Sequence, residues 1–254
     1  MNKENKQEFA YTSSWGVSTR LIGGVIMTHA DDEGMVVPPR IAPYEIVLLP
    51  LIKKPEDEVQ VMEYVNKLAI DLKKQTAFAE KIRLKIDARD KKPADKFWEW
   101  TKKGAPIICE IGMRDVESNG LMVRERLKIN TPEGKEIANR DEFVATIGDR
   151  IEKIQATMLE NAKMRLKQNI RTDITTPEEF SAYFANSNEW IEDGKQGKVA
   201  FVRGKWFEDE NTEELLKAMK ITIRCIPFDQ SGTKGKCLLT GKDATIDVIY
   251  ARSY

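Results

Sequence analysis

The sequence predicts a chain of mixed helix and strand, in which an α/β domain precedes a smaller α+β domain. Three observations lead to this fold class. Strand-like and helix-like segments alternate between residues 41 and 150, a long charged helical segment follows, and several strand-like runs occupy the last third of the chain. With 254 residues, 41% of them apolar, the chain has the length and the apolar content for two domains or one large one.

The predicted α/β domain spans residues 41–150 and begins after Pro38-Pro39. A continuous apolar run is typical of a strand covered on both faces, apolar residues three and four apart indicate a helix with one buried face, and alternation indicates a half-buried strand. In order, these patterns predict a strand at 44–52, a helix at 56–75, a strand at 82–86, a helix at 93–103 ended by Gly104, and strands at 106–111 and 120–129. Strands separated by helices pair in parallel, whereas the last two, joined by a short polar turn, predict an antiparallel hairpin.

A long helix and an α+β domain are predicted after this sheet. The segment 140–168 has Phe143, Ile147, Ile151, Ile154 and Met158 at helical spacing. We interpret it as a helix that closes the first domain, with residues 151–171 as a linking helix. The last domain, residues 172–254, starts a helix at Thr176-Pro177 and contains the strand-like runs VAFVRG, ITIRCI and ATIDVIYA.

Composition narrows the location and the partners of the protein. The 41 basic and 41 acidic residues balance, so any nucleic-acid binding must come from local clusters of charge. No run of 18 apolar residues exists and the first residues are polar, so we expect a cytoplasmic protein without a membrane partner. Cys109, Cys225 and Cys237 are few and far apart, which favours free thiols in a reducing compartment, and Cys225 is expected to be a small buried residue.

Residues 13–39 are the most informative stretch. Arg20 lies among apolar residues such as Val17 and Leu21, so a packed sheet and helix would accept it only with an anionic partner, for which a ligand phosphate is our first candidate. The alternative is a solvated or ion-paired arginine at the end of a strand. Asp31 and Asp32 are adjacent, and side chains of sequence neighbours usually diverge, so a helix-end or loop role is expected for them.

The order W-G-x-S-T-R-x-I-G-G-x-x-M-T-H-x-D-D-x-G-x-x-x-P-P in this stretch resembles the third signature motif of class II aminoacyl-tRNA synthetases, in the form found in prolyl-tRNA synthetases. The resemblance implies that residues 1–40 are part of a class II catalytic domain. It also implies that Arg20 lies against the ATP triphosphate and acts in catalysis by its charge, and that Ser18 lines the same ATP pocket.

The segment Cys109–Lys128 predicts a second site, because it places Glu110, Arg114, Asp115, Arg124 and Arg126 around a hairpin. Carboxylates accept from base amino and imino groups while arginines bind base acceptors or phosphates, so mixed charge suits selective RNA recognition. In an extended strand, Arg124, Arg126 and Lys128 would share one face. The alternative is a solvated hairpin face.

The sequence GAPIICEIGMRD resembles the anticodon-binding domain shared by the prolyl, threonyl, histidyl and glycyl synthetases, and is nearest to the prolyl form. This resemblance implies that Glu110 and Arg114 read the two guanines common to proline anticodons. Met113 stands where the family usually has proline, and this substitution is expected to loosen the turn that carries Arg114.

The end of the chain resembles the last domain of archaeal- and eukaryote-like prolyl synthetases, in TIRCIPFDQ, KGKC and YARSY. The resemblance implies that the carboxylate of Tyr254 folds back toward the catalytic domain. Zinc-binding members use two cysteine pairs here, but this chain keeps only Cys237 and has Thr240 in place of its pair, so no zinc is predicted.

Together, these resemblances imply the C-terminal part of a homodimeric proline-tRNA ligase, whose partners are ATP with Mg²⁺, proline and tRNA(Pro). The first and second class II motifs are missing, so we expect the chain alone to be inactive in amino-acid activation. The alternative is a stand-alone RNA-binding or regulatory paralogue without ligase activity. A metal-dependent enzyme is disfavoured by the single histidine and the few cysteines.

Overall fold

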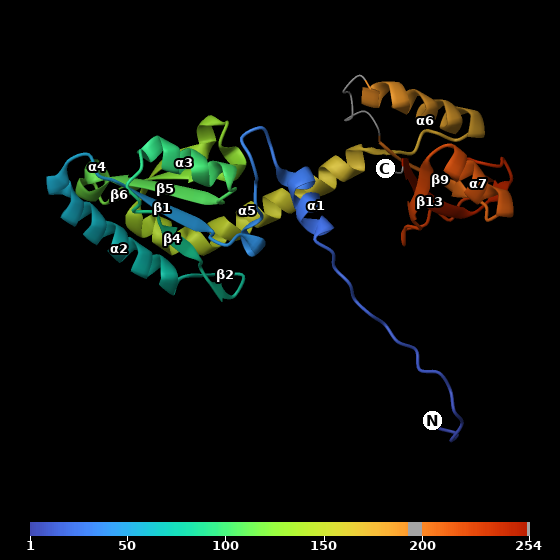
Figure 1. Cartoon of the computed structure of the whole chain (residues 1–254), viewed down its shortest axis with the longest axis horizontal. Helices are drawn as coiled ribbons and strands as arrows, with labels where there is room; N and C mark the ends of the chain where they lie inside the picture. The colour runs from blue at the N-terminus through green and yellow to red at the C-terminus, as the bar shows by residue number, and fades with distance from the viewer. Residues whose placement is uncertain (193–199, 253–254) are drawn as a thin grey trace. The chain divides into compact units, whose positions relative to one another are not determined.

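The computed structural model describes residues 1–192 and 200–252 of the chain. The chain divides into two compact units, Met1–Ala162 and Lys163–Tyr254, and each is described by itself (Figure 1). The finer division at residues 40, 150 and 171 stays a prediction.

The first unit is built on a five-stranded mixed sheet of order β4-β1-β5-β6-β7. Its strands are β1 (Ile46–Leu51), β4 (Leu84–Ile86), β5 (Ile107–Gly112), β6 (Gly120–Glu125) and β7 (Lys135–Asn139). Strand β1 pairs in parallel with β4 and β5, whereas β6 is antiparallel to both β5 and β7. The predicted parallel core with an antiparallel β5–β6 pair is therefore confirmed.

Helices cover both faces of this sheet. They are α2 (Glu58–Lys74), α3 (Pro93–Lys102), the short α4 (Met113–Glu117) and α5 (Arg140–Gln168). Figure 1 shows α3 on one side of the sheet and α2 on the other. The main core joins α2 and α5 to the strand residues Ile46, Leu48, Ile107, Cys109 and Val123, and a smaller core joins Phe97 of α3 to Val47, Leu49 and Ile108. The two cores use alternate residues of the same strands, as expected for a sheet buried on both faces.

The end of this sheet differs from the prediction in three ways. The β5–β6 connection contains helix α4 rather than a simple turn, and β6 ends at Glu125, where a 3₁₀ turn, Arg126–Lys128, begins. Strand β7 was not predicted, because its sequence KEIAN has little apolar character and the strand lies at the edge of the sheet. The small strands β2 (Thr76–Ala77) and β3 (Glu80–Lys81) and the 3₁₀ turns Pro39–Ile41, Pro55–Asp57 and Pro132–Gly134 complete the unit.

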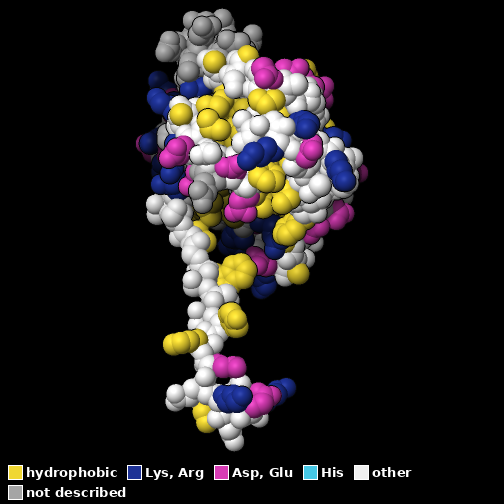
Figure 2. Space-filling model, turned by 90° about the vertical axis from the view of Figure 1, so that its right-hand side faces the viewer, with side chains coloured by type: hydrophobic (Ala, Val, Ile, Leu, Met, Phe, Trp, Pro, Cys, Tyr) yellow, Lys and Arg dark blue, Asp and Glu magenta, His cyan; other side chains and the backbone are white. Residues whose placement is uncertain are grey.

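The N-terminal segment also differs from the prediction. It forms one helix, α1 (Arg20–His29), and residues 1–18, all of which the structure describes, contain no helix or strand. The expected packed sheet is therefore wrong for this chain. Val17, Leu21 and Ile22 are 82%, 60% and 65% exposed, and Figure 2 shows hydrophobic side chains projecting along this segment.

The second unit has a four-stranded sheet of order β10-β13-β9-β8, and two helices lie wholly within its described residues. Its elements are β8 (Ile170–Arg171), α6 (Pro177–Glu192), β9 (Phe201–Trp206), α7 (Glu210–Ala218), β10 (Ile221–Cys225), β11 (Gly235–Lys236), β12 (Asp243–Ala244) and β13 (Ile246–Arg252). Phe180, Phe184, Val202, Val248 and Tyr250 are at the centre of its core. The helix start at Pro177 and the three main strands are confirmed. Cys225, however, is exposed at the end of β10, so its predicted burial is wrong.

Among the described residues, no helix is both long enough and apolar enough to cross a membrane.

Candidate functional site

One face of the first sheet is only partly covered, and this opening makes the candidate site. Helix α3 packs on Val47, Leu49 and Ile108. On the same face, Glu110 lies two residues further along β5 and Arg124 lies beside Ile108 on β6, and both are partly exposed. Ile108 is paired with Arg124 and Glu110 with Met122, so these four side chains point to the same side of the sheet. Ile137 of β7, paired with Met122, is 75% exposed and adds apolar surface beside the charges.

Glu110 and Arg124 form an ion pair on this open face. The Nε atom of Arg124 donates to Oε2 of Glu110 at 3.0 Å, and their side chains are 27% and 16% exposed. The Arg124 guanidinium also lies over the Phe97 ring, 4.8 Å from its centroid. Arg124 therefore has a fixed orientation, and a carboxylate that accepts one bond at Oε2 still has capacity to accept bonds from a base edge.

The loop at the end of β5 is organised by Asp115. One carboxylate oxygen of Asp115 accepts the backbone N–H of Gly112 at 2.8 Å, which closes the first turn of α4. Asp115 thus has a structural contact in addition to the predicted RNA contact. Met113 is the first residue of this helix, a position where proline is common, so its replacement of proline leaves the turn in place. Arg114 is exposed and makes no ion pair within the described part of the chain.

The prediction that Arg126 shares the exposed face of Arg124 is wrong. Its side chain has no exposed surface, and its Nη1 and Nη2 atoms bind Asp31 at 2.8 and 2.5 Å. The strand ends one residue earlier, so the backbone turns and Arg126 no longer shares the face of Arg124. Lys128 pairs with Glu125 at 3.3 Å. Asp31 has the loop role that was expected for it.

Sequence reasoning missed a set of basic residues that follow the carboxyl ends of the parallel strands. In open α/β sheets, ligands bind at this edge. Lys53 and Lys54 follow β1, Lys91 and Lys92 follow β4, and Arg114 follows β5. The sequence contained a signal for this set, because a pair of lysines follows each of the first two predicted strands, 44–52 and 82–86.

The loop after β4 is fixed by Asp87, which is buried. Asp87 accepts hydrogen bonds from Arg89 at 2.7 Å and from Nε1 of Trp100 at 2.8 Å. Hydrogen bonds from Arg89 hold the pKa of Asp87 far below its usual value in spite of burial. Lys103 and Arg89 similarly lower the pKa of Glu99 to about 2. These carboxylates, which are ionised at neutral pH, hold the loop that carries Lys91 and Lys92.

Ser18 and Arg20 lie on a separate segment. Both are exposed, and Arg20 is the first residue of α1, where unpaired backbone N–H groups and the helix dipole favour an anion. A guanidinium at this place suits a triphosphate. Within the described residues Arg20 has no ion pair and is exposed, so of the two alternatives this structure shows the solvated arginine, at the start of a helix and not at the end of a strand.

The remaining predicted sites are in the second unit. Tyr254 lies outside the described residues. Cys237 is buried, and the hydroxyl of Thr240 and nearby backbone N–H groups, including that of Leu239, lower its pKa against the effect of burial, which raises it. In residues 1–192 and 200–252, no group of three or more His, Cys, Asp or Glu side chains is arranged to hold a metal ion.

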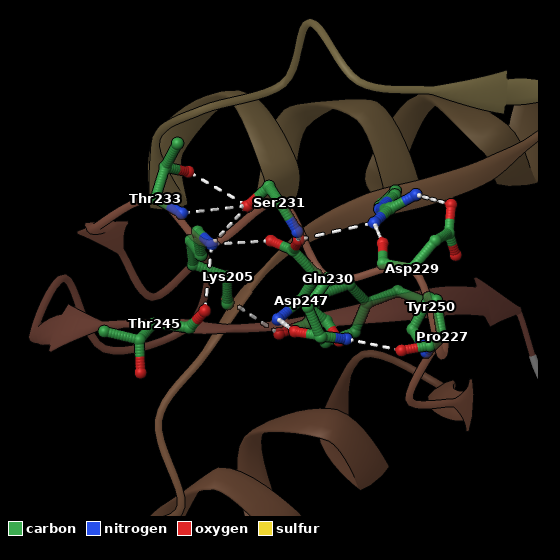
Figure 3. A network of polar contacts seen from close by, with 10 residues as sticks. Lys205, Pro227, Asp229, Gln230, Ser231, Thr233, Thr245, Asp247 and Tyr250 are labelled. Carbon is green, nitrogen blue, oxygen red and sulfur yellow. Dashed lines mark hydrogen bonds and ion pairs between the residues drawn. The ribbon is translucent and has the colours of Figure 1, made fainter.

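In the second unit, a polar network surrounds Asp247 (Figure 3). Lys205 pairs with Asp247 at 2.7 Å, and the backbone N–H of Ser231 donates to the same carboxylate at 2.7 Å. Gln230 accepts from the Asp247 N–H at 2.7 Å. Burial by itself would raise the pKa of Asp247, but Lys205 and Ser231 hold it far below its usual value. The network fixes the loop after β10 on β9 and β13, which is a structural role.

Two protein families match this chain. The anticodon binding domain matches residues 45–157, and the family described as "Prolyl-tRNA synthetase, C-terminal" matches residues 189–254. The first match contains the whole open face with Glu110 and Arg124.

Curated relatives extend the similarity to the whole chain. A proline-tRNA ligase of Protochlamydia amoebophila is 44% identical over 253 residues, which are 100% of this chain and 49% of that protein. One from Paramagnetospirillum magneticum is 43% identical over 98% of this chain and 47% of its own length. The chain therefore spans about half the length of the curated relatives that it matches.

Solved structures agree. The crystal structure of the Cryptosporidium parvum prolyl-tRNA synthetase complexed with L-proline and AMP matches with a TM-score of 0.80 and 30% identity, over 100% of this chain and 50% of that one. The chain is therefore similar to prolyl-tRNA synthetases along its whole length, with one match to an anticodon binding domain and a second match to the C-terminal domain of that family.

Proposed function

We propose that this chain recognises the anticodon of tRNA(Pro) as the C-terminal part of a proline-tRNA ligase. The Glu110–Arg124 pair on the open sheet face is the observation that carries the proposal. A charged acceptor and a charged donor, fixed side by side next to apolar surface, suit unpaired bases in an RNA loop. Arg114 provides a further donor, and the lysines at the carboxyl ends of the strands supply phosphate contacts.

In the complete protein, we propose that α1 belongs to the site that activates proline. ATP with Mg²⁺ would supply the reactive phosphates, and Arg20 with the N-terminus of α1 would stabilise their negative charge, with Ser18 nearby. The exposed apolar side chains of α1 would pack against the half of the protein that this chain does not cover. The carboxylate of Tyr254 would approach that site, and two such proteins would form a dimer in the cytoplasm. The likeness to a eukaryotic synthetase supports the archaeal- and eukaryote-like type, although the first curated relatives are bacterial.

RNA binding tests the anticodon proposal directly. Fluorescence anisotropy would compare a stem-loop carrying a proline anticodon with one whose two guanines are replaced. Wild type should prefer the first, and Glu110→Ala should reduce that preference by about tenfold or more, because hydrogen bonds to a charged acceptor contribute about 1.5–3 kcal/mol. Glu117→Ala, which removes an exposed glutamate from α4, is the matched control. Equal preference in wild type and Glu110→Ala would remove Glu110 from recognition.

Proline-dependent pyrophosphate exchange tests the assignment to a ligase. We expect no exchange from the chain alone and exchange when the N-terminal half of the complete protein is co-expressed. Arg20→Ala in the complete protein should then lower exchange sharply and leave stem-loop affinity unchanged. Specific stem-loop binding without exchange in the complete protein would favour the alternative, an RNA-binding paralogue without ligase activity.

A further inference from the structure

The segment that joins α1 to the first sheet is held by the buried Arg126. Its Nε atom donates to the carbonyl oxygen of Thr101 at 3.0 Å, and its Nη2 atom donates to that of Gly34 at 3.2 Å as well as to Asp31. With Nη1 bound to the other Asp31 oxygen at 2.8 Å, all three guanidinium nitrogens have partners on the segment or on α3. A fully buried charge is thus balanced by one carboxylate.

The backbone of the same segment lies directly on the end of α3. The N–H groups of Met35 and Val37 donate to the carbonyl oxygens of Lys102 and Gly104 at 3.0 and 3.3 Å. Gly34 has a φ of +126°, and a Cβ there would lie 2.7 Å from the Cα of Lys102. Such close backbone approach requires glycine and leaves the segment little freedom to move.

Arg126 and its partner Asp31 are each close in sequence to one of the two sites proposed above. Arg126 follows Arg124, the partner of Glu110, by two residues, and its own partner Asp31 follows the last residue of α1 by two. One arginine therefore joins the backbone next to the proposed anticodon contact to the segment that directly follows the helix carrying Arg20.

We propose that Arg126, together with Asp31, is a positioning residue that fixes the separation between the Arg20 and Glu110 sites, so that one tRNA spans both. The inference rests on the proposed function. A tRNA held by its anticodon must bring its distant 3′ end to activated proline, and a misplacement of about 1 Å can slow a reaction by about 100-fold. If the segment after α1 became mobile, prolyl transfer would therefore slow while each of the two sites stayed intact.

We call the contacts of Arg126 with Asp31, Gly34 and Thr101 the clamp. Hydrogen exchange on the 254-residue chain tests whether the clamp holds the segment after α1. Asp31→Asn and Arg126→Met should each speed exchange of the Met35 and Val37 amides by about tenfold or more, while amides of β5 and β6 stay protected. Asp71→Asn is the matched control, because Asp71 pairs with Arg140 at the same 2.5 Å and is 34% exposed, compared with 40% for Asp31. Unchanged protection in both clamp variants would overturn the proposal.

Kinetics of the complete protein test the positioning role. In Asp31→Asn, pyrophosphate exchange and stem-loop affinity should stay within about twofold of Asp71→Asn, while kcat/KM for tRNA prolylation falls by about tenfold or more. Equal prolylation by the two variants would refute positioning.

The double variant Asp31→Asn/Arg126→Met separates positioning from stability. It removes both charges, so it should recover most of the unfolding midpoint lost in Asp31→Asn, but not kcat/KM for tRNA. If the double variant recovered both the unfolding midpoint and kcat/KM for tRNA, the Asp31–Arg126 pair would contribute to stability alone and the positioning role would be refuted. If wild type shows neither exchange nor specific stem-loop binding, the proposed function fails and the positioning role falls with it, whereas the amide exchange result still decides whether the clamp exists.

Discussion

Arg124 and Arg126 are two residues apart and have opposite environments. Strict strand alternation would place both on the RNA-facing side, which was the prediction. Arg124 keeps that orientation because it is paired across the sheet with Ile108, whereas Arg126 lies past the end of the strand and turns into the protein. Sequence spacing therefore assigned Arg124 to the face on which the structure has it and assigned Arg126 to the wrong face.

The Asp31–Arg126 pair should make stability depend on pH. Hydrogen bonds from Arg126 lower the pKa of Asp31 in the folded state, so the unfolded state binds more protons and stability rises with pH. The contribution is complete above the unfolded pKa of about 3.9 and is lost as the pH falls through the lower folded value.

Urea unfolding of wild type and Asp31→Asn measures this effect. At pH 7, we expect the free energy of unfolding of Asp31→Asn to be lower than that of wild type by at most about 3 kcal/mol. This is the low end of the range for breaking a buried ion pair, because Asp31 is partly exposed. The difference should shrink below about pH 4. A difference that stays constant from pH 7 to pH 3 would contradict the assignment.

At the scale of elements, helix α5 packs against the β2 strand through Gly148. A Cβ on Gly148 would lie 2.3 Å from the carbonyl oxygen of Thr76. Helix propensity alone would favour alanine at this position, so the contact decides against propensity. The sequence predicted the helix from its apolar spacing, but the close approach to β2 depends on tertiary packing.

Gly148→Ala should therefore destabilise the protein by about 1–3 kcal/mol, the usual range for overpacking. Gly23→Ala is the matched control, since Gly23 is also inside a helix but a Cβ there meets nothing within 4 Å. It should be neutral or stabilise by up to about 1 kcal/mol. The measurement is the free energy of unfolding of the unit that contains both glycines. A Gly148→Ala protein as stable as Gly23→Ala would show that the helix can shift freely.

At the scale of the whole molecule, two separate cores predict two unfolding transitions. Ile147→Ala removes a fully buried side chain from the first unit, and Phe180→Ala removes one from the second. Each should lower the midpoint temperature of its own transition. The free energy of unfolding should fall by about 2–5 kcal/mol for Ile147→Ala and by about 3–5 kcal/mol for Phe180→Ala. Calorimetry measures both midpoints in one scan. If either variant shifted both transitions equally, the two units would be folding as one.

The sequence by itself determined the main helices and strands of both units, the parallel core with its antiparallel β5–β6 pair, and the resemblance that pointed to an anticodon-binding surface. Periodic apolar residues and local motifs carry that information, because each depends on a few neighbouring positions. Only the tertiary structure decided that Glu110 forms an ion pair with Arg124 on the open face and that Arg126 is buried against Asp31. It also decided that β7 completes the sheet. These features join residues that are distant in the chain, and a side chain's environment is set by which of those partners the fold brings to it.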